Sequence, residues 1–306
     1  MSPEHDPVLV VGEALVDIVE RDGSTSEHVG GSPANVAMGL ARLGHHTSLA
    51  ACIGDDDRGA VVARHLGDHG VSLAPGTVRA GRTSTAVATI GGDGAAEYTF
   101  DLVWDPALEG LASASHVHTG SLATVLAPGS AAVVDLLRRV VGEATVSYDP
   151  NIRPSVVGDP AALVDGVEEV VRLSDVVKAS DEDVALLYPE ASLDEVVERW
   201  LALGPGLVVV TRGAAGVVWR SASGTQGSSP TRAERVVDTV GAGDSFMAGL
   251  LSGLLDADLL GGPGAADSLR QADGPTLEAA IDRGLTTSAL TVAHPGAYAP
   301  TRSEFP

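Results

Sequence analysis

A glycine-rich turn at 238–249 constrains this chain more than any other segment. It reads Asp-Thr-Val-Gly-Ala-Gly-Asp-Ser-Phe-Met-Ala-Gly, between a predicted strand at 235–237 and a predicted apolar helix at 246–255. Gly241, Ala242 and Gly243 let the backbone pass close to a ligand, and the free N–H groups of a first helical turn attract anions. The segment therefore predicts a strand, a phosphate site and a helix in succession.

Asp244, at the start of that helix, indicates what happens to the phosphate. A carboxylate repels a neighbouring phosphate, so its sensible role is to take the proton of a hydroxyl that attacks phosphorus. The turn is not a Walker A loop, because it lacks the Gly-Lys-Ser/Thr ending and Lys178 is the only lysine of the chain. We expect Asp244 to be a general base in phosphoryl transfer.

Predicted strands and helices alternate along most of the chain. Strands are expected at 8–12, near 117, and at 145–148, 176–177 and 207–211, and helices at 130–141, 161–173, 193–203 and 277–292. The pattern is typical of a mostly parallel α/β sheet covered by helices, whose ligands lie at the carboxyl ends of the strands. No G-x-G-x-x-G follows the first strand, which argues against dinucleotide binding, and 261–274 is expected to be a loop or a poorly ordered insertion.

Four shorter stretches with alternating hydrophobicity predict a second, smaller sheet. They lie at 15–20, 27–29, 84–90 and 96–100. Asp-Gly and Gly-Gly pairs at 21–24 and 91–94 are hairpin signals. These strands are expected to be separate from the main body.

Composition favours a soluble, cytoplasmic protein. The 306 residues could form one large α/β domain or two small ones, and with 44% apolar and 3% aromatic residues the core must be Ala, Val and Leu. Cys52 is the only cysteine, which excludes an internal disulfide and suits a reducing compartment. No apolar stretch reaches the length of a membrane span, and residues 1–6 lack the basic region of a secretory signal.

The formal charge of −22 argues against nucleic acid or anionic membranes as partners. It also repels anionic substrates such as ATP. Local backbone N–H groups, a divalent metal and a few arginines must therefore overcome a repulsive overall field.

The turn resembles the D-T-x-G-A-G-D signature of the ribokinase-like (PfkB) carbohydrate kinases, and G-G-S-P-A-N at 30–35, closed by Leu43-Gly44, resembles that family's N-terminal signature. The resemblance covers nearly the whole chain. It implies a single ribokinase-like domain over 1–306, a Rossmann-like mostly parallel sheet with helices, and a small β-sheet lid with strands at about 15–29 and 84–101. ATP and Mg²⁺ would be bound, and the lids of two subunits would pair in a homodimer, because an open sheet edge needs cover.

The acceptor sugar is expected between the first strand and the lid. Asp17 can accept two hydroxyl donors, Gly30 and Gly31 let a sugar press against the backbone, and the resemblance implies that Asp17, Gly31 and Asn35 hold it. The D-P-N-I-R-P stretch places Arg153 after a strand, where it could meet a phosphate or a sugar hydroxyl, or be a surface arginine in a turn.

The nucleotide and metal positions also follow the resemblance. K-A-S-D-E-D falls where the family shows N-x-x-E, so Ser180 and Asp183 replace Asn and Glu; both keep oxygen ligands, with Asp183 reaching Mg²⁺ through water. Ser180 is also a good helix N-cap. T-x-G-x-x-G implies a nucleotide turn at Thr211, Gly213 and Gly216, although an ordinary hairpin has the same pattern.

Asp238 matches a position that in many relatives helps to hold a monovalent cation, often K⁺. The motifs together look most like those of fructokinases, with D-fructose as acceptor and fructose 6-phosphate as product. 2-Keto-3-deoxygluconate kinase, whose acid substrate needs a cation such as Arg82 or Arg153, and ribokinase remain alternatives. Adenosine-type kinases are disfavoured by the few aromatic residues of the lid. A non-catalytic sugar-binding regulator is the alternative of another class, but it would have no need of Asp244.

Overall fold

A computed structural model describes residues 7–21, 23–90, 96–111 and 113–305. The acidic start at 1–6, the predicted turn at 91–94 and Asp22 of the turn at 21–24 lie outside the described residues. Within the described residues, nine strands form the main sheet in the order β15-β14-β13-β12-β11-β10-β1-β4-β6. Their bounds are Val8–Val11 (β1), Thr47–Ala50 (β4), Ser72–Leu73 (β6), His116–Gly120 (β10), Thr145–Asp149 (β11), Val176–Ser180 (β12), Leu207–Thr211 (β13), Val217–Ser221 (β14) and Gln226–Ser229 (β15).

The main sheet is mostly parallel, which confirms the predicted fold class. Strands β6, β4, β1, β10, β11, β12 and β13 pair in parallel, and only β14 and β15 run antiparallel at one edge. Side chains alternate between its faces: Val8 and Val10 of β1 join one core cluster, whereas Leu9 and Val11 join the other. Both faces are therefore buried, as a parallel sheet requires.

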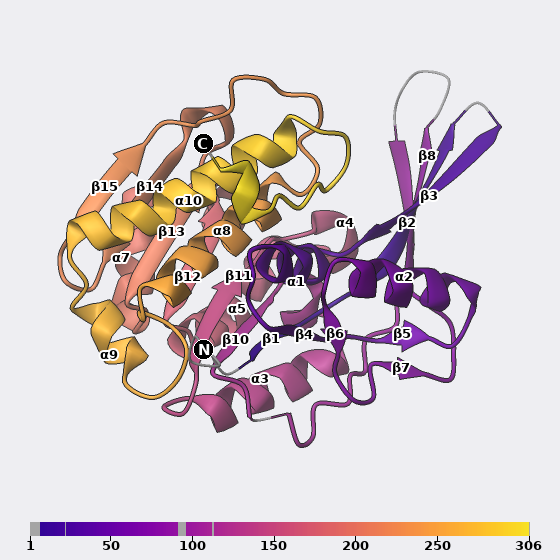
Figure 1. The fold of residues 1–306 in the computed structure, drawn as a ribbon, viewed down its shortest axis with the longest axis horizontal. Coiled ribbons are helices and arrows are strands. Elements are labelled where there is room, and N and C mark those ends of the chain that lie inside the picture. Colours follow the sequence, from indigo (N-terminus) through magenta and orange to yellow (C-terminus); the bar gives the residue numbers. More distant parts are fainter. Residues whose placement is uncertain (1–6, 22, 91–95, 112, 306) are drawn as a thin grey trace.

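Helices cover the two faces (Figure 1). The helices whose buried residues join the core of Val8 and Val10 are α1 (Ser32–Arg42), α2 (Asp57–Asp68), α8 (Ala242–Asp256), α9 (Ala265–Arg270) and α10 (Gly274–Val292). Those of the opposite core are α3 (Gly129–Val140), α5 (Val164–Arg172), α6 (Asp181–Leu187) and α7 (Leu193–Leu203). Short elements complete the chain: β5 (Ile53–Gly54), β7 (Val78–Arg79), α4 (Pro154–Val157) and 3₁₀ turns at Ser121–Thr124, Pro160–Leu163, Gly213–Ala215 and Arg302–Glu304.

The predicted small sheet is confirmed. It has the order β3-β2-β8-β9, formed by Leu15–Arg21 (β2), Ser24–Gly30 (β3), Thr85–Ile90 (β8) and Ala96–Asp101 (β9). The outer pairs are antiparallel and β2 pairs with β8 in parallel. In Figure 1 these strands project from the main body.

Two local predictions were wrong. Residues 235–237 form no strand. Val237 N–H instead donates to Val292 O at 2.7 Å, so this segment lies against the carboxyl end of α10 and not in the sheet. Residues 261–274 are not all loop, because α9 lies there and buries Leu269 completely. Sequence windows this short carry too little periodicity to reveal either outcome.

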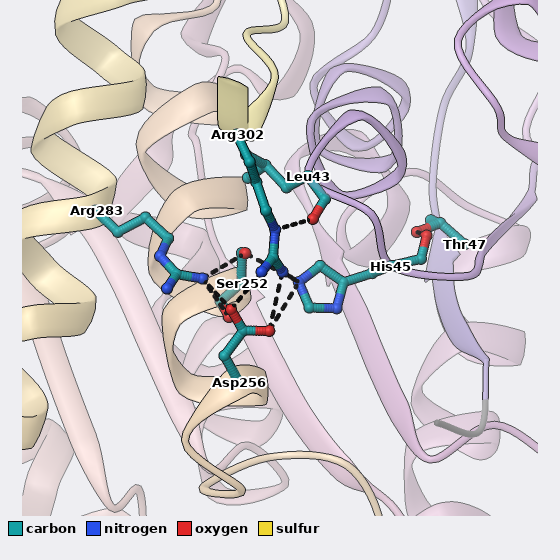
Figure 2. Close-up of polar contacts among 7 residues, drawn as sticks. All are labelled: Leu43, His45, Thr47, Ser252, Asp256, Arg283 and Arg302. Atoms are coloured by element: carbon teal, nitrogen blue, oxygen red, sulfur yellow. Dashed lines mark hydrogen bonds and ion pairs between the residues drawn. The ribbon is translucent and has the colours of Figure 1, made fainter. Parts of the chain in front are cut away.

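A charged cluster ties the C-terminal segment to the main body (Figure 2). Asp256, at the end of α8, accepts hydrogen bonds from Arg302 (2.9 Å) and Arg283 (2.5 Å). Arg302 Nε also donates to Leu43 O at the end of α1, and His45 Nε2 lies 2.9 Å from Ser252 Oγ. The cluster therefore joins the carboxyl ends of α1 and α8.

Within the described residues, the helices are all too short or too polar to cross a membrane.

Candidate active site

A cavity of about 690 Å³ opens where the predicted ligand edge lies. Its lining comes from the residues that end or follow β1, β10, β11, β12 and β13, together with β2 and β8 of the small sheet and the start of α8. The carboxyl ends of five parallel strands thus converge on one space, as the strand topology predicts. The small sheet supplies another of its walls.

The turn before α8 is shaped by its glycines. Gly241 is the N-cap residue with φ 74°, and a Cβ there would stand 2.7 Å from the Cβ of Ala297. The first-turn N–H groups have no partners inside the helix and open to the cavity, which Gly241, Ala242 and Gly243 line. Ala242 N–H already donates to Thr239 O at 3.2 Å. Gly241 and Gly243 therefore offer the more available amides to an anion.

Asp244 joins the two glycine motifs. Its carboxylate accepts a hydrogen bond from Ser32 Oγ at 2.6 Å and from Asn35 Nδ2 at 2.8 Å, and the residue is 8% exposed at the cavity wall. Asn35 Oδ1 is buried without a hydrogen-bond partner among the described residues. Sequence reasoning gave Asn35 to the sugar and no role to Ser32, because the contact spans more than two hundred residues.

The predicted sugar residues gather at the small-sheet end of the cavity. Asp17 and Gly31 line it. A Cβ on Gly30 would stand 1.9 Å from Asp17 Oδ2, so Gly30 makes room for that carboxylate although it is not itself in the lining. Burial raises the pKa of Asp17, partly opposed by the charges of His28 and Arg153. Arg153 is exposed and lines the same cavity, whereas Arg82 is paired with Asp101.

The only lysine of the chain lies in the cavity wall beside the start of α8. Lys178 Nζ donates to Asp149 Oδ2 at 2.6 Å, with both side chains at most 4% exposed. A Cβ on Gly243 would stand 3.1 Å from Nζ, so the ammonium group is beside the first turn of α8. Burial acts to lower the pKa of Lys178, but the charge and hydrogen bond of Asp149, together with the charges of Asp183 and Asp244, outweigh it and raise that pKa. Sequence reasoning missed this role; the signal was a lysine within an apolar strand.

Ser180 and Asp183 form the predicted helix cap. Ser180 Oγ accepts from Asp183 N–H, and Asp183 Oδ2 accepts from Ser180 N–H (2.8 Å) and Oγ (2.6 Å). Asp183 Oδ1 accepts from Ile152 N–H at 2.7 Å. Both oxygens of Asp183 thus hold protein groups, and Ser180 and Asp183 line the cavity.

The T-x-G-x-x-G segment is both a cavity wall and a hairpin connection. Thr211 and Gly213 line the cavity. Gly216 does not; it has φ 83°, and a Cβ there would stand 2.1 Å from Ser229 O, so it serves the turn between β13 and β14. Asp238 lies outside the lining and accepts from Val240 N–H (3.1 Å) and Gly296 N–H (2.8 Å). It joins the segment before α8 to the loop at Gly296.

Glu13 is a further residue that sequence reasoning missed. It follows β1, lines the cavity and is 8% exposed, and its Oε2 has no hydrogen-bond partner among the described residues. Burial raises the pKa of Glu13 to about 7, against a smaller opposing effect of the Ser121 hydroxyl. Its place directly after the first strand was the available signal.

Comparison with known proteins agrees with this geometry. Residues 6–304 match a family described as "pfkB family carbohydrate kinase". A fructokinase of Klebsiella pneumoniae is 34% identical over 261 residues, which cover 81% of this chain and 84% of that protein. A fructokinase with bound ATP from Xylella fastidiosa is similar in structure, with TM-score 0.83 and 25% identity over 97% of this chain and 96% of that chain. A fructokinase double mutant from Vibrio cholerae O395, in a fructose-, ADP- and potassium-bound form, has TM-score 0.78 and 28% identity over 99% of this chain and 98% of that chain.

Proposed function

Since the chain belongs to the pfkB family of carbohydrate kinases, we propose that its cavity holds ATP and a sugar together and that Asp244 is the general base. Asp244 takes the proton of the sugar's primary hydroxyl as that oxygen bonds to the γ-phosphorus. The bond from the γ-phosphorus to the β,γ-bridging oxygen breaks, and ADP leaves. The observation that carries this proposal is the Asp244 carboxylate at the start of α8, held by Ser32 and Asn35 at the cavity wall.

Asp244 is oriented before any substrate arrives. Each of its oxygens already accepts one hydrogen bond, which fixes the carboxylate and leaves further lone pairs toward the cavity. Positioning a base in this way lowers the activation barrier, because the base does not have to be ordered during the reaction. The general-base step is expected to supply roughly 10²–10⁴ in rate.

Backbone amides and one side-chain cation together stabilise the negative charge of the transferring phosphate. Gly241 and Gly243 amides supply the positive end of a helix, and the Lys178 ammonium stands beside them. Charge stabilisation of this kind must be local, because the chain as a whole carries −22. Asp149 holds the lysine in place.

Mg²⁺ fits this cavity as a partner of the phosphates. No group of three or more His, Cys, Asp or Glu in the described part of the chain is placed to hold a metal by itself. Mg²⁺ usually needs only one or two carboxylates together with substrate phosphates and water. Asp183 and the exposed Asp181 and Glu182 provide such oxygen atoms at the lining, with Asp183 acting through water. When bound, the ion would neutralise phosphate charge.

A K⁺ site beside Asp238 is a second cation proposal. Asp238 ties the 238–240 loop to the 296 loop through two N–H donors, and backbone carbonyls would supply the other ligands of the ion. Higher turnover in KCl than in NaCl would support the site, and equal turnover would refute it.

D-fructose is the proposed acceptor, as in the relatives whose motifs this chain shares. Asp17, Gly31 and Asn35 hold the sugar, and Arg153 closes one side. For a 2-keto-3-deoxygluconate kinase, Arg82 is not available in the cavity, because it pairs with Asp101. Ribose remains a second acceptor to test. A non-catalytic regulator is disfavoured by the hydrogen-bonded Asp244.

We also propose that the four-stranded sheet is the lid of one kinase domain over 1–306 and that two lids pair in a homodimer. The β3 edge strand is largely exposed, and Tyr98 of β9 is 58% exposed and stacked on Phe100. Open sheet edges need cover. Light scattering coupled to size exclusion would return a dimer mass if this is right and a monomer mass if not. The single cysteine and the use of ATP favour the cytoplasm.

The test of function is ADP release with Mg-ATP and each of fructose, ribose, 2-keto-3-deoxygluconate and adenosine, with a no-sugar control. Fructose-dependent release, with fructose 6-phosphate as product, is the expected result. Release with another sugar would change the acceptor and keep the mechanism. Sugar binding without release under any condition would favour the regulator.

A further inference from the structure

Glu13 is held at the sugar end of the cavity by its own backbone. Its carbonyl oxygen lies under Gly31, where a Cβ would come within 2.4 Å of it. Gly31 and Asp17 line the same end. The backbone of Glu13 therefore packs next to the predicted sugar contacts. Only 8% of the residue is exposed.

One oxygen of this buried carboxyl group is left without a protein partner. Ser121 hydrogen-bonds the side chain, but Glu13 Oε2 has no partner in the described part of the chain. Asp183 and Asp244, in the same wall, have both oxygens engaged. A buried polar atom without a partner is costly, so a polar ligand that supplies one is favoured at this place.

The backbone around that oxygen is also unusual. Ser121 has φ 52°, a left-handed conformation that residues other than glycine rarely adopt, and it is 3% exposed at the cavity wall. Such strain collects at ligand sites, where the surrounding structure enforces it. Ser121 is the residue whose hydroxyl hydrogen-bonds the Glu13 side chain, and both residues line the cavity.

The charge at this end favours an uncharged ligand. Glu13, Asp17 and Asp244 bring three carboxyl groups to the lining, and Arg153 is the exposed cation among them. These carboxyl groups would repel the carboxylate of a sugar acid. Hydroxyl groups of a neutral sugar would instead donate to them.

We propose that Glu13 accepts a hydrogen bond from a secondary hydroxyl of the acceptor and makes the site select uncharged sugars over sugar acids. This rests on the proposed sugar-kinase function. Glu13 exchanges no proton with the reacting oxygen; it determines specificity by binding, equally before and during transfer.

The test compares the wild-type enzyme with Glu13→Gln and with Glu168→Gln as the matched control. Glu168 is also a buried glutamate, but its partners are Arg172, Arg199 and Tyr188 and it is not in the lining. In Glu13→Gln we expect the KM for fructose to rise about 10- to 100-fold, because a hydrogen bond to a charged group is lost. The kcat should change by less than about threefold, as for uniform binding.

Specificity is the second readout. The ratio of kcat/KM for fructose over 2-keto-3-deoxygluconate should fall by at least about tenfold in Glu13→Gln, because the repulsion of the acid is relieved and the fructose contact is weakened. Glu168→Gln should keep the wild-type KM and ratio. An unchanged KM and ratio in folded Glu13→Gln would overturn the proposal.

Direct binding separates this proposal from the proposed function. Calorimetry with fructose and no ATP should show about 10- to 100-fold weaker binding by Glu13→Gln. The affinity of the wild type for fructose should increase from pH 6 to 8, because the Glu13 carboxyl ionises over this range. If the wild type releases no ADP with any sugar, the kinase proposal fails, and weaker binding by the variant still supports Glu13. Equal binding, or no sugar binding at all, refutes it. Glu13→Met, which removes the charge and keeps the bulk, replaces Glu13→Gln if the latter does not fold, with the same expected losses.

Discussion

Asn35 and Asp244 are hydrogen bonded across the molecule: Asn35 Nδ2 donates to Asp244 Oδ2 at 2.8 Å, although the residues are 209 positions apart. One belongs to the helix that follows the small sheet and the other to the helix that follows the glycine-rich turn. The bond joins the N-terminal glycine motif and the glycine-rich turn, which line the same cavity. The carboxyl ends of the same two helices are joined separately, through Arg302, which donates to Leu43 O and to Asp256.

Replacing the base should remove turnover and keep the fold. Asp244→Asn is expected to lower kcat by roughly 10²–10⁴, because the amide cannot accept the proton. The neighbours Ser32 and Asn35 keep a polar partner, so the thermal midpoint should stay close to that of the wild type. ADP release and a melting curve check both. Asp258→Asn, on the surface, is the control; wild-type kcat in Asp244→Asn would contradict the mechanism.

A methyl group on Gly30 should damage sugar binding. The added Cβ would stand 1.9 Å from Asp17 Oδ2 and must displace that carboxylate. We expect Gly30→Ala to raise the KM for the sugar by about tenfold or more, in line with a lost charge-assisted hydrogen bond. Gly67→Ala adds a methyl group with no heavy atom within 4 Å and is the matched control. Steady-state kinetics with both variants decides, and equal KM values would disprove the role of Gly30.

The Lys178–Asp149 pair allows its structural and catalytic roles to be separated. Lys178→Met should cost about 3–5 kcal/mol of stability, because Asp149 is left as a buried charge without its partner. Lys178→Met combined with Asp149→Asn should regain most of that loss. Its kcat should remain at least about 10²-fold low, because the cation beside the phosphates is still absent. Chemical denaturation and turnover measure the two effects; recovery of turnover in the double variant would mean that the lysine serves only Asp149.

Glu13 should make stability depend on pH near neutrality. The pKa of Glu13 is raised to about 7 from an ordinary 4.5, mainly by burial, so the fold favours its protonated form. The resulting stability is fully present below pH 4.5 and is lost as pH rises through about 7. Glu13→Gln should therefore lose less stability than the wild type between pH 5 and pH 8, by roughly 2–3 kcal/mol. Parallel urea titrations at the two pH values test this, and identical losses would refute it.

The Arg302 cluster should weaken in acid. Burial acts to raise the pKa of Asp256, but hydrogen bonds from Arg302 and Arg283 outweigh it and hold that pKa below its ordinary value. The stabilisation is present above about pH 4 and is lost as pH falls through the lowered pKa. Arg302→Ala should cost roughly 1 kcal/mol at pH 7 and less in acid. Melting curves check it, with Arg138→Ala, an exposed pair with Glu169, as the control; an equal cost at both pH values would rule the cluster out as the cause.

The main predictions from the sequence depended on local patterns, and the structure contains the elements that these patterns predicted. Alternating strands and helices predicted the parallel sheet because both faces of such a sheet are buried and its strands read as apolar runs, as in Leu207–Thr211. Leu193–Leu203 was predicted with the right bounds because its apolar period and Ser192 cap are contained in one segment. Where the pattern was shorter than a turn or two, as at 235–237 and 261–274, prediction failed.

The sequence by itself determined the order of elements, the two glycine turns and the acid that would act on a hydroxyl, because propensity, periodicity and motif spacing are properties of neighbouring residues. Only the tertiary structure decided which distant residues meet. It placed Asn35 against Asp244, Lys178 beside Gly243 and the unpartnered oxygen of Glu13 at the sugar end. Hydrogen bonds, burial and the resulting pKa shifts depend on distances in space, which a linear sequence does not contain.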